Sequence, residues 1–171
     1  MRRVLVIGSG GAGKSTFAAR LGAWLDLPVV HLDAVYWRPG WVRMPEPEWR
    51  ETVAHLVARD AWVMDGNYSG TLDLRLAACD AVVFLDSPRA VCLARVLRRW
   101  LRYVGRTRPD MAPGCPEQLT WEFVRWVWDY PRTRRPGILR RLAALPPDRQ
   151  VIVLRSRASV EQFLAGLPRG A

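Results

Sequence analysis

The stretch from Gly8 to Thr16 carries the residues whose types and spacing most clearly predict a chemistry. Its sequence, Gly8-Ser9-Gly10-Gly11-Ala12-Gly13-Lys14-Ser15-Thr16, fits the pattern G-x-x-x-x-G-K-[ST] and lies between an apolar run at residues 4–7 and a helical pattern from residue 17. Glycines let successive backbone N–H groups surround polyphosphate oxygens, and the dipole of the following helix favours the same negative charge. The stretch therefore predicts a phosphate-binding loop rather than a glycine-rich turn without a ligand.

Two side chains of this loop predict ATP and magnesium as its ligands. Lys14 would reach the β and γ phosphates, and the hydroxyl of Ser15 would ligate the magnesium ion that bridges them. Lys14 is also the only lysine of the chain, because all the other basic residues among the 26 are arginines. A compact ammonium can curl over phosphates inside a tight loop, whereas a planar guanidinium cannot.

Length and composition restrict the class of protein. The 171 residues suit a single domain, residues 1–171, and half of them are apolar, which is enough for a folded core. Three cysteines without a C-x-x-C pair argue against a disulfide framework or a zinc site, so we expect a reducing, cytoplasmic setting. No apolar run approaches the roughly 18 residues of a membrane span, and the short run after Met1-Arg2-Arg3 does not suit a signal peptide. We therefore expect no membrane partner.

The formal net charge of +10 has two interpretations. One is a nucleic-acid surface, and the other is an arginine-lined pocket for phosphorylated substrates. The arginines concentrate in two groups that bracket one segment, which favours the pocket in part. The groups are Arg95, Arg98, Arg99, Arg102, Arg106, Arg108 and then Arg132, Arg134, Arg135, Arg140, Arg141.

Two carboxylates follow apolar runs that are typical of buried strands. Asp33 follows residues 27–32, and Asp65 follows residues 61–64. Ligands of open α/β sheets bind at the carboxyl ends of the strands. Asp65 would hold the water shell of magnesium beside the loop, or it only caps the turn with Gly66. The aromatic segment 34–41 is either a loop on the substrate side or packing for the core or a lid.

The remaining patterns alternate between helix and strand. Helices are expected at residues 14–25, 46–58, 72–78, 89–104, from Pro116, at 133–145 and at 160–167 with Ser159 as cap, and strands at 4–7, 81–85 and 151–154. The aromatic stripe Trp121, Phe123, Trp126, Trp128 is more typical of a core than of ligand contacts. Together these elements predict an α/β P-loop NTPase fold, with a five-stranded parallel sheet, helices on both faces and a helical lid at about 104–135.

The loop, Asp65-Gly66 and the bracketing arginines resemble those of the nucleoside monophosphate kinase group of P-loop proteins, adenylate kinases included. More narrowly, the chain resembles bacterial proteins named DNA topology modulation protein, or adenylate kinase-like. The runs that carry this likeness are His31-Leu32-Asp33-Ala34, Trp37-Arg38-Pro39-Gly40-Trp41, Asp65-Gly66-Asn67-Tyr68 and residues 105–117. The broader resemblance implies a strand order of 2-3-1-4-5, a lid and transfer of the γ-phosphoryl group of ATP to an acceptor.

The resemblance also implies roles for particular residues. Arg95 would stack on adenine, Arg99 would touch the phosphates, and Arg132 or Arg135 would return to the transferring group. Asp33 resembles the carboxylate that meets the accepting hydroxyl in shikimate and gluconate kinases. The catalytic set is thus Lys14, Asp33, Arg99 and Arg135, and the substrate set adds Arg38, Asp65, Arg75, Arg106 and Arg108. Arg155 belongs either to the nucleotide site or to a solvated turn.

The acceptor stays open, because the chain departs from adenylate kinases after Asp65-Gly66. Their aromatic, proline and arginine residues, which grip the acceptor phosphate, are replaced by Asn67-Tyr68-Ser69-Gly70. We therefore expect an ATP- and magnesium-dependent phosphotransferase acting on a nucleotide or a small hydroxylated acceptor. The alternatives are a nucleotide-regulated protein that binds DNA through its arginines and a P-loop ATPase without an acceptor.

Overall fold

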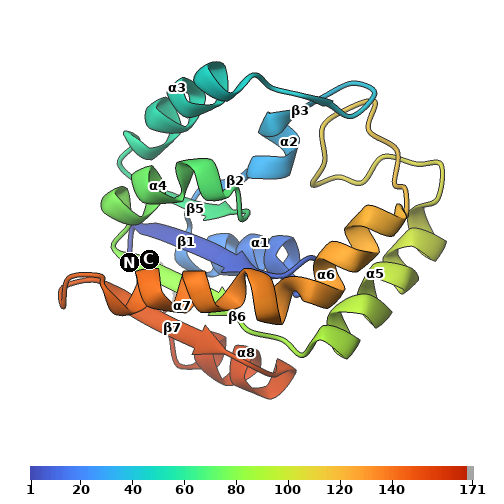
Figure 1. The fold of residues 1–171 in the computed structure, drawn as a ribbon. Helices are drawn as coiled ribbons and strands as arrows, with labels where there is room; N and C mark the ends of the chain where they lie inside the picture. Colours follow the sequence, from blue (N-terminus) through green and yellow to red (C-terminus); the bar gives the residue numbers. More distant parts are fainter. Residues whose placement is uncertain (169–171) are drawn as a thin grey trace.

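A five-stranded parallel sheet forms the centre of the computed structural model, which describes residues 1–168 (Figure 1). The strands lie in the order β2 (Val29–His31), β5 (Trp62–Asp65), β1 (Arg3–Gly8), β6 (Ala81–Leu85) and β7 (Gln150–Leu154). Counted by themselves, these strands have the expected order 2-3-1-4-5. The labels differ only because β3 and β4 form a separate hairpin and take two numbers. The predicted fold class is confirmed.

Helices cover both faces of the sheet (Figure 1). Val4 and Val6 of β1 pack into one cluster with α1 (Lys14–Leu25), α5 (Arg89–Tyr103) and α8 (Arg157–Ala165). Leu5 and Ile7 point to the opposite face, where α3 (Glu46–Val57), α4 (Leu72–Ala78) and α7 (Arg135–Ala143) complete the core. Because the central strands are buried on both faces, their side chains are apolar without alternation.

The aromatic segment after β2 is more ordered than the expected loop. It forms α2 (Leu32–Tyr36) and a hairpin of β3 (Trp37–Arg38) and β4 (Val42–Arg43). Gly40 and Trp41 have φ angles of 77° and 63°, and such left-handed residues are what a tight hairpin turn requires. Asp33 consequently lies in the first turn of α2, two residues beyond the end of β2.

Two helix starts differ from the sequence prediction. Helix α6 (Trp121–Thr133) begins at Trp121 rather than at Pro116, because the hydroxyl of Thr120 accepts a hydrogen bond from the N–H of Phe123 and caps the helix. Helix α8 has Ser156 as its N-cap, and Ser159 is the reciprocal partner in a capping box. The 3₁₀ turn η1 (Ser69–Thr71) precedes α4.

Helix α6 is less uniformly buried than its aromatic stripe predicts. Val127 and Tyr130 join the core, but the side chains of Trp121 and Trp128 are 73% and 48% exposed. The core interpretation is therefore wrong for these two tryptophans. Residues of α6 pack in the core, although we expected this helix to belong to the lid. Of the expected lid, residues 104–120 are the part that forms an irregular segment outside the core.

This segment, residues 104–120, is docked on the β3–β4 hairpin (Figure 1). The N–H of Gly40 donates to the carbonyl of Gly114 over 2.9 Å, and the indole Nε1 of Trp41 donates to the carbonyl of Pro116 over 3.0 Å. Met111 packs in a small cluster that Trp37 and Trp41 join.

None of the helices in the described residues combines the length and apolar character that a membrane span requires.

Arg75 of α4 is a buried structural residue and not the substrate contact that we expected. Its side chain is fully buried, and its guanidinium donates to four backbone carbonyls, those of Gly66, Asn67, Tyr68 and Thr71, over 2.6–3.2 Å. Burial lowers the pKa of Arg75 to about 10, so the group keeps its charge at neutral pH. The residue fixes the chain that leaves β5 instead of facing a ligand.

Replacing Arg75 should therefore lower stability. Arg75→Met leaves buried carbonyls without donors, and we expect the free energy of unfolding to fall by about 2–4 kcal/mol. Urea unfolding of both proteins measures this difference, with Arg59→Met as control because Arg59 is exposed. An Arg75→Met protein as stable as the control would show that the carbonyls find other partners.

Candidate active site

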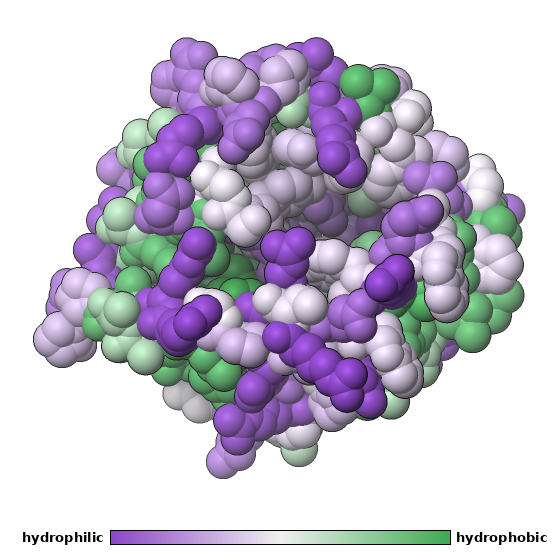
Figure 2. Space-filling view, in the orientation of Figure 1, coloured by the Kyte–Doolittle hydropathy of each residue, from purple (hydrophilic) through white to green (hydrophobic). Residues whose placement is uncertain are grey.

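A cleft of about 1610 Å³ opens along the carboxyl edge of the sheet. Figure 2 shows the molecule hollowed near its centre, with hydrophilic side chains around the hollow. The predicted site residues that line the cleft are Gly10, Gly11, Ala12, Gly13, Lys14, Ser15, Thr16, Asp33, Arg95, Arg99 and Arg108. The structure thus brings together the phosphate loop, one of the two carboxylates and three arginines.

The loop has the backbone geometry of an anion cradle. Gly11 and Gly13 have φ angles of 76° and 96°, which L side chains rarely adopt, and a Cβ on Gly11 would collide with the carbonyl of Cys92. Helix α1 begins directly after Gly13, with no side-chain cap and no acidic residue in its first turn. Its N-terminal N–H groups and dipole are therefore left for an external anion. The residues present fit nucleotide phosphates.

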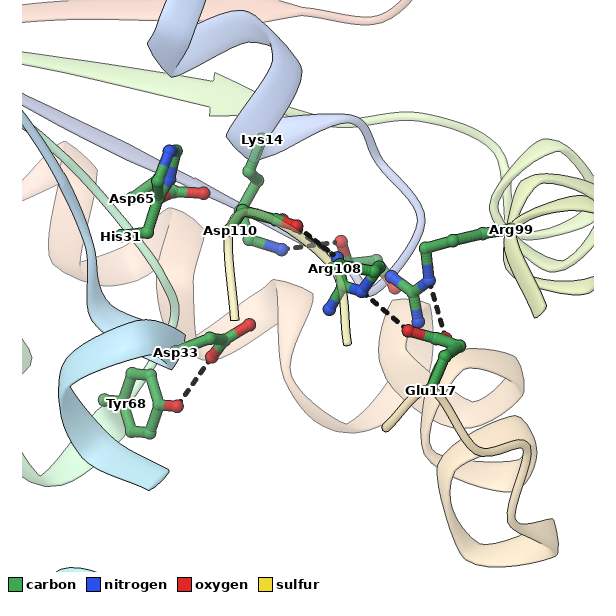
Figure 3. Close-up of polar contacts among 10 residues, drawn as sticks. Lys14, His31, Asp33, Asp65, Tyr68, Arg99, Arg108, Asp110 and Glu117 are labelled. Atoms are coloured by element: carbon green, nitrogen blue, oxygen red, sulfur yellow. Dashed lines mark hydrogen bonds and ion pairs between the residues drawn. The ribbon is translucent and has the colours of Figure 1, made fainter. Parts of the chain in front are cut away.

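Lys14 lies over this loop. Its Nζ donates to the carbonyl of Ser9 over 3.0 Å (Figure 3). Burial lowers the pKa of Lys14, and the charges of Asp33 and Asp65 oppose that change. A phosphate would compensate the buried charge better than one carbonyl does.

Asp65 does not line the cleft, because it lies behind His31. The carboxylate is 4% exposed, and its Oδ1 lies 2.6 Å from Nδ1 of His31. This hydrogen bond raises the pKa of His31. No group of three or more His, Cys, Asp and Glu residues in the described chain could hold a metal by itself. A magnesium ion in the cleft would thus depend on the hydroxyl of Ser15 and on phosphate oxygens.

Asp33 is held in place by a tyrosine. The hydroxyl of Tyr68 donates to Oδ1 of Asp33 over 2.6 Å (Figure 3). Burial, and then the nearby charge of Asp33, raise the pKa of Tyr68, so its hydroxyl stays protonated and remains the donor. Asp33 therefore has a fixed orientation at the wall of the cleft.

A buried carboxylate joins two arginines on the opposite wall. Glu117 is 6% exposed and accepts a hydrogen bond from Nε of Arg99 over 2.8 Å (Figure 3). It also forms an ion pair with Arg108, whose Nε lies 2.6 Å from its carboxylate. Arg108 also pairs with Asp110, while Arg95 donates to the carbonyl of Ala12 in the phosphate loop over 3.0 Å. Guanidinium groups from α5 and from residues 104–120 are thus held side by side near the loop.

The other expected site residues lie away from the cleft wall. Arg38 pairs with Glu48 on the surface, and Arg106 is exposed. Arg135 forms a two-bond ion pair with Asp86, which Arg155 also approaches at 3.5 Å. None of these arginines lines the cleft in the described chain, and neither does Gly8, whose backbone pairs with the side chain of Asn67. Arg38 and Arg75 therefore do not face an acceptor in this arrangement.

Sequence reasoning missed His31, Tyr68, Asp86 and Glu117 as site or supporting residues. Three of them have a signal in the sequence, because His31, Tyr68 and Asp86 lie at or near carboxyl strand ends. Glu117 has no such signal, since its burial depends on a backbone bridge between Val104 and Glu117 that joins the two ends of an irregular segment. Pairing of this kind has no periodic pattern in a sequence.

Comparison with known proteins supports the fold. No protein-family model and no curated protein matches the chain. The shikimate kinase of Acinetobacter baumannii, solved in complex with shikimate, matches with a TM-score of 0.63 and 16% identity over 96% of this chain and 89% of that chain. A putative kinase from Chloroflexus aurantiacus gives 0.50 and 16% over 98% and 100%, and a sugar kinase from Janibacter sp. gives 0.49 and 21% over 96% and 93%. The chain therefore has an α/β fold that kinases adopt.

The Asp86–Arg135 ion pair predicts a pH-dependent stability. The hydrogen bond from Arg135 lowers the pKa of Asp86 in the folded protein. The ion pair therefore contributes its full stabilisation when the pH is above the ordinary pKa of an aspartate. This stabilisation is lost as the pH falls through the lowered pKa of Asp86. We expect Asp86→Asn to be less stable by about 1–2 kcal/mol at pH 7, with the difference shrinking below about pH 4.

Urea unfolding at several pH values measures this difference. Asp73→Asn is the control, because Asp73 is exposed and pairs with an exposed Arg50. A difference that stays constant down to pH 3 would contradict the assigned role of the ionised Asp86.

Proposed function

We propose that the chain is an ATP- and magnesium-dependent phosphotransferase of the adenylate kinase-like class. The observation that carries the proposal is the uncapped start of α1, which lies with Lys14 in the same cleft as the Tyr68-bound carboxylate of Asp33. An anion cradle facing a fixed carboxylate suits transfer of a phosphoryl group to a hydroxyl. The acceptor class is a nucleotide or a small hydroxylated molecule, and the kinase-type fold supports this assignment.

The side chains of the cleft would act mainly by position and charge. ATP would supply the phosphoryl group, and magnesium bound with Ser15 would neutralise part of the phosphate charge. Lys14 and Arg99 would stabilise the charge that develops during transfer, and Arg95 would support the loop. Asp33 would orient the accepting hydroxyl and take its proton. Arg135 would require a rearrangement to join them, because Asp86 holds it outside the cleft.

Residues 104–120 would act as the lid in this proposal. They carry Arg108, contact the hairpin through backbone hydrogen bonds and contribute little to the main core. Release and return of this segment would admit substrates and then exclude water, which suppresses hydrolysis of ATP.

The arrangement of the arginines favours this function over the DNA-binding alternative. Arg99 and Arg108 face the cleft, while Arg20, Arg38, Arg50 and Arg135 already pair with carboxylates. A surface that binds duplex phosphates would instead present unpaired cations along one face. If DNA binding were the function, affinity would fall steeply with salt between about 50 and 200 mM.

Loss of Lys14 tests the proposed function. We expect Lys14→Ala to lower acceptor-dependent ADP formation by at least about a hundredfold, because one preorganised charge donor is removed from the transferring group. The measurement is ADP release from magnesium and ATP with a panel of nucleoside monophosphates, nucleosides and small hydroxylated metabolites. Arg59→Ala serves as the control, since Arg59 is exposed and lies outside the cleft.

Near-normal turnover in Lys14→Ala would refute the assignment of the loop. Lys14-dependent ADP release that no acceptor accelerates would favour the P-loop ATPase alternative.

A further inference from the structure

One end of the cleft has a chemistry of its own, and we call it the acceptor lobe. It is lined by Asp33, Tyr36, Trp37, Trp41, Tyr68 and Met111. On the basis of the proposed function, we infer that this lobe takes a polyhydroxylated ring without a phosphate or carboxylate group, such as a sugar or a nucleoside. This inference excludes the nucleoside monophosphates that the broader resemblance implies.

The charge of the lobe favours an acceptor that is not an anion. Tyr68 is the only side chain hydrogen-bonded to Asp33 within residues 1–168. The charge of Asp33 raises the pKa of Lys14, but the two side chains do not form an ion pair. Carboxylates accept hydrogen bonds from hydroxyl groups and repel anions. A hydroxylated acceptor without a negative charge therefore fits the lobe.

Most of the arginines near the lobe already have protein partners. Arg75 is buried on backbone carbonyls, Arg38 pairs with Glu48 outside the cleft, and Arg108 pairs with Asp110 and Glu117. Arg43 is the remaining arginine of the hairpin, and it is exposed, with its guanidinium 6.0 Å from the centre of the Trp37 ring. Recognition of a phosphate usually needs a guanidinium fork or backbone donors aimed at it. Of the two hairpin arginines, Arg43 is the one without an ion pair within residues 1–168.

The aromatic walls of the lobe suit a small ring. Trp37 and Trp41 lie with ring centres 5.2 Å apart, and Tyr36 and Tyr68 lie 4.6 Å apart, so aromatic rings form much of the wall. Such walls bind the apolar face of a ring, while a few polar groups fix its orientation. Met111 and the hydrogen bonds between residues 104–120 and the hairpin close the lobe on one side. A small molecule fits this space better than the end of a polymer.

The reaction follows from these contacts. The acceptor hydroxyl oxygen forms a bond to the γ phosphorus of ATP, the bond from that phosphorus to its bridging oxygen breaks, and the electron pair leaves with ADP. The hydroxyl proton passes to the free oxygen of Asp33 and then to solvent, so charge and atoms balance.

Binding measurements on matched pairs of compounds test the inference without depending on turnover. Calorimetry of the protein with saturating ADP compares adenosine, guanosine, glucose and inositol with their monophosphates, and gluconate with glucose. We expect at least one uncharged ring to bind about tenfold or more tightly than its charged partner. Asp33→Asn should weaken binding of that ring by about tenfold or more, because the hydrogen bond from a ring hydroxyl to a charged carboxylate is lost. The same substitution should not weaken binding of the corresponding monophosphate. Asp73→Asn, which lies on the surface, should change neither.

Tighter binding of the monophosphates or of gluconate would overturn the inference, as would no binding by any uncharged ring of the panel. Binding of ADP by itself is measured first, and its loss in Lys14→Ala reports on the proposed function. Failure of ADP binding therefore counts against the phosphotransferase, whereas ADP binding with a charged acceptor counts only against this inference.

Discussion

The feature on which the proposed site depends is the uncapped start of α1, whose N–H groups would attract an anion. Gly13 cannot cap the helix with a side chain, and the first turn offers no carboxylate, so the N–H groups have no partner from the protein side chains. The parallel sheet holds this helix end at its carboxyl edge, and the backbone of α5 leaves room for no Cβ at Gly11. The packing of the fold thus forms the cradle, which is preorganised before any ligand binds.

Charge neutralisation explains the rest of the cleft. Burial shields the side chains of Lys14 and Arg99 from water, which lowers the pKa of each. Glu117 compensates Arg99 and Arg108 from within residues 104–120. At the other end, Tyr68 fixes the carboxylate of Asp33, which forms no ion pair within residues 1–168. In the proposed function, phosphates would lie at the end with the uncapped helix and the accepting hydroxyl at the end with Asp33, which is the order that phosphoryl transfer requires.

Much of this could be predicted from the sequence, because local patterns determine it. The loop motif, the apolar runs of β1 and β6 and the periodicity of α1, α3 and α5 predict the sheet and the candidate phosphate site. The arginines could not be sorted in the same way. Arg75, Arg99 and Arg135 look alike in a sequence, but one binds carbonyls, one faces the cleft and one pairs with Asp86. Their partners lie far apart in the chain or depend on irregular backbone, so only tertiary structure distinguishes them.

The most direct test of the central claim is phosphorus NMR of the protein with magnesium, ATP and the acceptor panel. The account predicts a new phosphoester resonance that grows as the γ-phosphate signal of ATP decreases, in one acceptor class and in proportion to ADP. This result would identify both the reaction and the acceptor. The contrary result is a decrease in ATP matched only by inorganic phosphate, or no decrease at all, with every acceptor. In that case the cleft would bind phosphates without transferring them to a hydroxyl.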